Sequence, residues 1–130
     1  MDYDQALDSI VSDLKQKYSY LTELLEITKE MGRVSLEDTN AVSALIDKRQ
    51  GIMYEANKLD DKIINIVSNM PEVQREKIKV CLRDGEIVFT NQKEAEISGA
   101  HKHNKELLNV IIAEDEKMNE RMKQHVRENE

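Results

Sequence analysis

The sequence has few of the residues that force a chain to turn or that cross-link a small fold. Its 130 residues include no tryptophan, one phenylalanine, four tyrosines, one proline, four glycines and one cysteine. A single cysteine, Cys81, excludes an internal disulfide and gives no sign of an oxidising compartment. Few obligatory breaks and few bulky aromatic groups favour long helices with narrow apolar stripes. We therefore expect one all-α domain over residues 1–130.

Long apolar runs and charge runs of one sign are also missing. No segment approaches the roughly eighteen apolar residues of a membrane span, and the acidic start, MDYDQALDSI, is the reverse of a signal peptide. The formal net charge is −7, and both signs alternate without the basic face that is typical of nucleic-acid binders. These patterns predict a cytoplasmic protein with no membrane insertion and no nucleic-acid partner.

Apolar residues recur in alternating steps of three and four along the first half of the chain. This spacing predicts a helical hairpin over residues 3–69. Gly32 stands where a helix C-cap favours a residue able to take positive φ. Ser35 and Asp38, three residues apart, resemble a capping box that opens the second helix.

The second half is expected to be helical over residues 71–127, beginning at Pro71, which suits a first helical turn. The letters IVFT at 87–90 also fit a strand, but no second strand-like run exists in the sequence to pair with them. We therefore favour helix, with Gly85 and Gly99 as the places where it can break. The expected architecture is an antiparallel bundle of three long helices, or four if the last segment breaks, with coiled-coil packing.

One seam position of the second helix is charged. Arg49 interrupts the apolar series that runs from Val42 to Met70. In a continuous antiparallel bundle Arg49 lies level with about Gln92, and the two can form a polar layer that sets register. Alternatively, Arg49 lays its stem along the seam and keeps its charge in water. The sequence leaves both interpretations open.

The helix lengths leave part of the last helix without a partner. If the chain turns near residues 35 and 70, the third helix is matched only to about residue 103, and roughly 35 Å of helix extends beyond it. That part carries an apolar stripe that has to fold back, dimerise or receive a partner. The expected client-binding residues are Leu107, Leu108, Ile111, Ile112, Met118 and Met122. For the two methionines, packing in the core of a folded-back helix is the alternative.

Motifs for catalysis or for metal and cofactor binding are absent from the sequence. His101 and His103 are two residues apart, which places them on different faces of a helix. There is no HExxH, no CxxC, no Glu-x-x-His pair and no glycine-rich phosphate loop. Nothing in the sequence pairs Cys81 with a base, and it fits a buried stripe position. We predict a protein that is not an enzyme and has no catalytic, metal-binding or cofactor-binding residues.

Two stretches resemble the flagellar type III export chaperones. YLTELLEITKEM, then Asp38 in the connection, then VSALIDKRQGIMYEANKLDDKI is similar to the first hairpin of the FlgN-like and FliT-like group, over about residues 18–66. HNKELLNVI, within residues 97–122, is similar to a stretch of the FlgN-like branch. Residues 72–96 match neither branch, so the choice between them stays open.

The resemblance implies a cytoplasmic bacterial chaperone without catalytic activity. Members of this group bind an export substrate near its C-terminal helix and keep it unassembled until it reaches the export gate. The implied client is a hook–filament junction protein or the filament cap, bound through an amphipathic helix, with an export-gate component as a second partner. A homodimer is a further alternative, since the apolar stripe can also self-associate. Two other interpretations stay open, a structural coiled-coil protein without a client and a small regulatory helical bundle.

Overall fold

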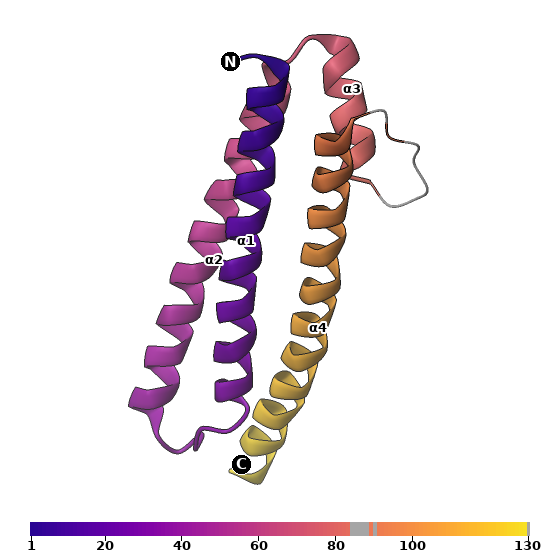
Figure 1. Ribbon diagram of the computed structural model, residues 1–130. Coiled ribbons are helices and arrows are strands. Elements are labelled where there is room, and N and C mark those ends of the chain that lie inside the picture. The colour runs from indigo at the N-terminus through magenta and orange to yellow at the C-terminus, as the bar shows by residue number, and fades with distance from the viewer. Residues whose placement is uncertain (84–88, 90, 130) are drawn as a thin grey trace.

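The described residues of the computed structural model form four helices and no strand (Figure 1). The structure describes residues 1–83, 89 and 91–129. The helices are α1 (Tyr3–Met31), α2 (Thr39–Ser68), α3 (Glu72–Cys81) and α4 (Gln92–Glu128). Both α2 and α4 pack along α1. The predicted all-α bundle is therefore confirmed.

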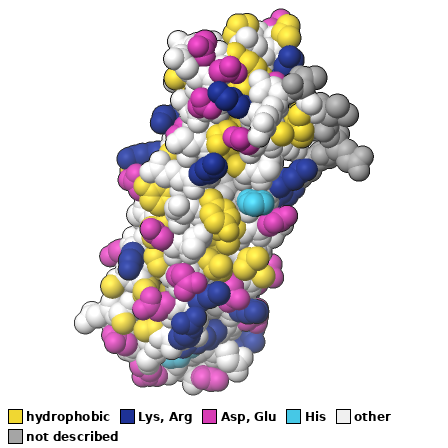
Figure 2. Space-filling view, in the orientation of Figure 1, with side chains coloured by type: hydrophobic (Ala, Val, Ile, Leu, Met, Phe, Trp, Pro, Cys, Tyr) yellow, Lys and Arg dark blue, Asp and Glu magenta, His cyan; other side chains and the backbone are white. Residues whose placement is uncertain are grey.

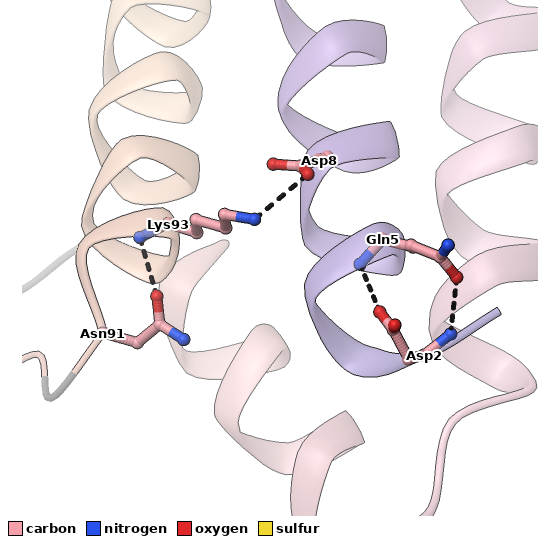
Figure 3. A network of polar contacts seen from close by, with 5 residues as sticks. All are labelled: Asp2, Gln5, Asp8, Asn91 and Lys93. Carbon is pink, nitrogen blue, oxygen red and sulfur yellow. Dashed lines mark hydrogen bonds and ion pairs between the residues drawn. The ribbon is translucent and has the colours of Figure 1, made fainter.

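The predicted hairpin is formed by α1 and α2, which run antiparallel. Asp2 caps α1, because its carboxylate accepts from the N–H of Gln5 at 2.7 Å and the Gln5 side chain accepts from the N–H of Asp2 at 3.0 Å (Figure 3). Asp38 caps α2 by accepting from the N–H of Ala41 at 3.1 Å. Gly32 follows α1 with a φ of −74°, so the left-handed cap expected from the sequence does not form.

Helix α4 runs parallel to α1. Lys93, in the first turn of α4, donates to Asp8 of α1 at 3.0 Å, and this hydrogen bond raises the pKa of Lys93 (Figure 3). At the other end, Arg121 donates to the backbone carbonyls of Met31, at 2.8 Å, and of Val34. The direction of α4 is thus fixed by polar contacts at both of its ends.

The last segment is broken, contrary to the favoured continuous helix. α3 ends at Cys81 and α4 begins at Gln92, so the break lies between them and not at Gly99, which is inside α4. Gly85 and most of the strand-like stretch 87–90 lie outside the described residues. Because α4 starts again beside the N-terminus of α1, its apolar stripe is buried along the whole of α1, which a helix continuous with α3 could not achieve.

The interior follows α1 from end to end as three groups of apolar side chains, and α4 contributes to each. In order along α1, they centre on Leu7, Ile10, Ile63, Ile78 and Ile97; on Leu21, Leu24 and Ile111; and on Ile27, Met31, Leu45 and Met118. Ile111 is 2% exposed and Met118 7%. The expectation that residues beyond about 103 lack partners is therefore wrong, because it assumed one continuous third helix.

Candidate functional site

The surface has few features that are typical of enzymes. Side chains of both charge signs are interspersed over the face shown in Figure 2, with hydrophobic side chains in smaller areas between them. Within the described ranges, no three His, Cys, Asp or Glu side chains are grouped so that they could hold a metal ion. No helix in those ranges is both long and apolar enough to cross a bilayer. The most distinctive surface feature is an apolar groove between α2 and α4.

The groove begins where α3 ends. α3 packs against both α2 and α4, and its Ile78 and Cys81 belong to the core. With ten residues α3 is about 15 Å long, whereas α4, with 37 residues, is about 55 Å long. α3 therefore takes the position of a fourth helix only beside the first turns of α4 (Figure 1), and beyond Leu82 the described residues leave a groove there.

The open position is a groove of about 410 Å³ with α1 as its floor. It is lined by residues of all three long helices and by the residue that follows α3. The described lining is Leu14, Lys17 and Leu21 of α1, Asp60, Ile63 and Ile64 of α2, Leu82, and His101, Asn104, Lys105 and Leu108 of α4. Two of the large apolar side chains remain open to solvent, since Ile64 is 62% exposed and Leu108 41%. An apolar partner surface could cover both.

An ion pair joins α2 to α4 about two turns of α4 after Leu108. Arg49 of α2 donates through one terminal nitrogen to both carboxylate oxygens of Asp115 of α4, at 2.6 and 2.5 Å. Leu108, Ile112 and Asp115 are spaced by four and three residues, which puts them on one face of α4. Between His101 and Leu108, the first and last lining residues of α4, the helix rises by about 10 Å, or about two turns, and Ile112 continues the same face for one turn more.

Basic side chains prevail around the groove although the chain is acidic. Lys17 and Lys105 line it beside Asp60, and Arg75 and Lys79 line its continuation between α2 and α3. Lys17 donates to Asp60 at 2.8 Å. The described lining thus holds four basic side chains and one acidic side chain, in a chain whose formal net charge is −7. Local charge complementarity therefore favours an acidic partner.

Asn104 is buried in the groove wall with half of its amide unsatisfied. The residue is 5% exposed, and its Nδ2 donates to the carbonyl of Leu14 at 3.1 Å. Its Oδ1 has no donor among the described residues. Asp13 also has one oxygen without a donor there, but its other oxygen accepts from Lys62 at 3.1 Å, and Asp13 lies outside the groove lining. The unsatisfied acceptor at the groove is therefore that of Asn104.

The structure separates the six residues that were expected to bind a client. Two are buried, two half-buried and two exposed, namely Ile111 and Met118, Leu107 and Met122, and Leu108 and Ile112. They do not form one exposed face, because α4 packs on α1 through the side that carries the buried pair. The two exposed residues lie instead on the side of α4 that carries the groove. Client binding by any of these residues remains a prediction.

The predicted polar layer of Arg49 and Gln92 does not form. Gln92 is the first residue of α4 and is exposed, whereas Arg49 pairs with Asp115, 23 positions further along (115 − 92 = 23). The assumed level was wrong because α4 is not continuous with α3 and starts again beside the N-terminus of α1. The spacing of Asp115 from Leu108 and Ile112 places it on the same helical stripe, and this pattern in the sequence could have indicated Asp115 as a partner for Arg49.

A buried polar cluster that the sequence did not indicate joins the starts of α1 and α4. The Tyr3 hydroxyl donates to the buried carboxylate of Glu94 at 2.6 Å. Burial, and then this hydrogen bond, raise the pKa of Tyr3. Burial also raises the pKa of Cys81, with the charge of Glu94 as a second cause. A thiol that is buried and held protonated is a poor nucleophile.

No protein-family model matches the chain, and no curated protein and no solved structure matches it either. The resemblance to the export chaperones therefore stays a prediction from the sequence.

Proposed function

We propose that this chain is a protein-binding chaperone or adaptor that takes an amphipathic helix of a partner into the groove between α2 and α4. The observation that carries the proposal is that α3 takes the fourth-helix position for about 15 Å and that the described residues leave a groove in its continuation beyond Leu82. A partner helix lying there would complete a four-helix arrangement. Its apolar face would cover Ile64 and Leu108, and acidic flanks would meet the basic rim.

The apolar area at the groove is sufficient for moderate affinity. Burying one leucine-sized side chain stabilises a complex by roughly 1.5–3 kcal/mol. Ile64, Leu108 and Ile112 on this side, with a similar number on the partner helix, offset an association cost of about 4–15 kcal/mol. We therefore expect micromolar dissociation constants, which is suitable for a client that must later be released.

The more specific form of the proposal rests on the resemblance in the sequence. In that form the partner is the C-terminal helix of a hook–filament junction protein or of the filament cap, held in the bacterial cytoplasm before export, with an export-gate component as the receiver. The chain acts by binding alone, without catalysis. A partner helix that carries leucine-like residues at helical spacing fits both the flagellar form of the proposal and the general helix-binding form.

The test uses the full chain and helical segments from the C-termini of these flagellar proteins, with binding measured by calorimetry. Leu108→Glu places a charge in the groove and is expected to weaken binding at least tenfold, because Leu108 is exposed and its loss leaves the core intact. Val110→Glu is the matched control, since Val110 is 47% exposed but lies on a different face of α4. Binding that both variants leave unchanged would place the site elsewhere.

A second copy of the chain is the competing occupant of the groove. Sedimentation of the free chain distinguishes the two, since the proposal expects a monomer at micromolar concentration. A dimer that Leu108→Glu dissociates would assign the groove to self-association and contradict the proposal. If no flagellar segment binds but a designed acidic amphipathic helix does, the flagellar form fails and the groove remains a helix-binding site.

A further inference from the structure

We propose that Asn104 selects among partner helices by requiring a hydrogen-bond donor on their otherwise apolar face. This inference rests on the proposed function, because it assigns the partner's chemistry at the same groove. The donor would come from a side chain such as Ser, Thr, Asn or Gln at one position of the partner's apolar stripe. That position would lie opposite Asn104, between the level of Leu82 and that of Leu108.

The bundle itself gives little reason for an amide at this position. Asn104 donates to the carbonyl of Leu14, but Leu14 lies within α1, where its carbonyl already accepts from the N–H four residues later. The amide therefore satisfies no acceptor that would otherwise lack a partner. Its Oδ1, in contrast, is left without a donor among the described residues, which is costly in a buried place. An apolar side chain of similar size would avoid that cost.

The groove is where the missing donor can come from. Asn104 lines it between Ile63 of α2 and Leu108 of α4, so an occupant of the groove lies against its side chain. The terminal torsion of asparagine is soft, and a modest rotation turns the oxygen towards an occupant. Rotation also moves Nδ2 away from the Leu14 carbonyl, which keeps its bond within α1, so an occupant side chain that both donates and accepts, such as Gln, would satisfy both halves of the amide. A donor on the occupant thus completes the amide, whereas a wholly apolar occupant leaves Oδ1 as unpaired as it is in the free chain.

The selection follows from this difference. A binding site with a buried polar group discriminates strongly against ligands that leave that group unpaired. Apolar partner residues at the other stripe positions would give affinity, and the single donor would fix the register of the helix along the groove. Asn104 is therefore a specificity-determining residue and contributes less to affinity as such.

The experiment uses full-length protein and a set of designed sixteen-residue helical peptides with a leucine stripe and glutamate flanks. At each stripe position in turn, leucine is replaced by glutamine or by methionine, which are similar in size but differ in the donor. We expect the glutamine peptide to bind at least tenfold more tightly than its methionine counterpart at one stripe position. Asn104→Leu should abolish that preference and raise the thermal midpoint of the free chain. Asn109→Leu, exposed on another face of α4, should preserve the preference.

The other possible outcomes show whether only the role of Asn104 is wrong or whether the groove as a binding site is wrong as well. If no peptide binds, or if Leu108→Glu does not weaken binding, the groove is not the site and both fall. If peptides bind in the groove but glutamine and methionine are equal at every position, the role of Asn104 is wrong and the groove stands. A preference that persists in Asn104→Leu has the same meaning. If far-ultraviolet circular dichroism shows that Asn104→Leu does not fold, Asn104→Ala is used in its place.

Discussion

At the residue scale, Arg49 shows how one charged seam position finds a partner. The sequence offered a polar layer or a side chain that keeps its charge in water. The structure has an ion pair with Asp115 in which the two side chains are 22% and 26% exposed. The Arg49 Nε is buried and has no partner among the described residues. This geometry joins α2 to α4 but satisfies the guanidinium only in part.

We predict that Arg49→Leu lowers the free energy of unfolding by about 1 kcal/mol, because it leaves Asp115 beside an apolar surface. The double variant Arg49→Leu with Asp115→Leu should recover that loss or exceed the wild type, as replacement of both partners of such a pair often does. Urea unfolding of the two single variants and the double variant measures the coupling. Lys117→Leu, at an exposed pair within α4, should have almost no effect. Additive losses in the double variant would contradict the prediction.

Tyr3 and Cys81 determine how the fold responds to alkali. Both pKa values are raised in the folded chain, first by burial and then by Glu94. At about pH 7 and below, both groups are protonated whether the chain is folded or unfolded, so stability does not depend on them there. Above about pH 9 for Cys81 and about pH 10 for Tyr3, the unfolded chain loses these protons while the folded chain keeps them. The free energy of unfolding therefore falls as pH rises through this range.

Tyr3→Phe should make this alkaline decline shallower, because it removes one of the two titrating groups and keeps the ring. It should also lower stability at neutral pH, since Glu94 loses its donor. Unfolding by urea between pH 7 and pH 11 checks both effects. Tyr54→Phe is the control, because Tyr54 is 62% exposed. Identical slopes for wild type and Tyr3→Phe would show that Tyr3 titrates normally in the folded chain.

At the element scale, the sequence predicted which parts are helical better than how they are arranged. Periodicity is a local signal, so it predicted the helical nature of α1, α2 and most of the rest, whereas the left-handed cap expected at Gly32 does not form. The level at which α4 starts beside α1 depends on contacts between distant residues, such as Lys93 with Asp8. No local pattern encodes such a contact. The groove was missed for the same reason, although one of its exposed apolar residues, Leu108, was already on the predicted face.

The packing of α4 predicts opposite outcomes for two adjacent isoleucines. Ile111 is 2% exposed in the middle of the core, whereas Ile112 is 47% exposed on the groove side. Ile111→Ala should lower the free energy of unfolding by about 2–5 kcal/mol, because it leaves a cavity that the bundle cannot fill. Ile112→Ala should change stability by less than about 0.5 kcal/mol. Thermal and urea unfolding test the pair, and similar losses in both would mean that α4 packs through a different face.

At the scale of the whole molecule, net charge and local charge favour different partners. A chain of formal net charge −7 repels acidic ligands at long range, yet the described groove lining has four basic side chains and one acidic. The Debye length decides which field a ligand experiences. It is about 30 Å in 0.01 M salt, so that the whole molecule contributes, and about 10 Å in 0.1 M salt, so that nearby side chains prevail.

We therefore predict that, at 0.1 M salt, an amphipathic peptide with glutamate flanks binds more tightly than the same peptide with lysine flanks, by roughly tenfold. At 0.01 M salt this preference should shrink or reverse, because the net negative charge then acts on the peptide as well. Arg75→Gln should reduce the preference for the acidic peptide, whereas Lys58→Gln, exposed on α2 outside the groove lining, should leave it unchanged. Calorimetry at both salt concentrations measures these differences. A lysine-flanked peptide that binds more tightly at both would mean that net charge governs association, and the basic rim would then have no part in choosing the partner.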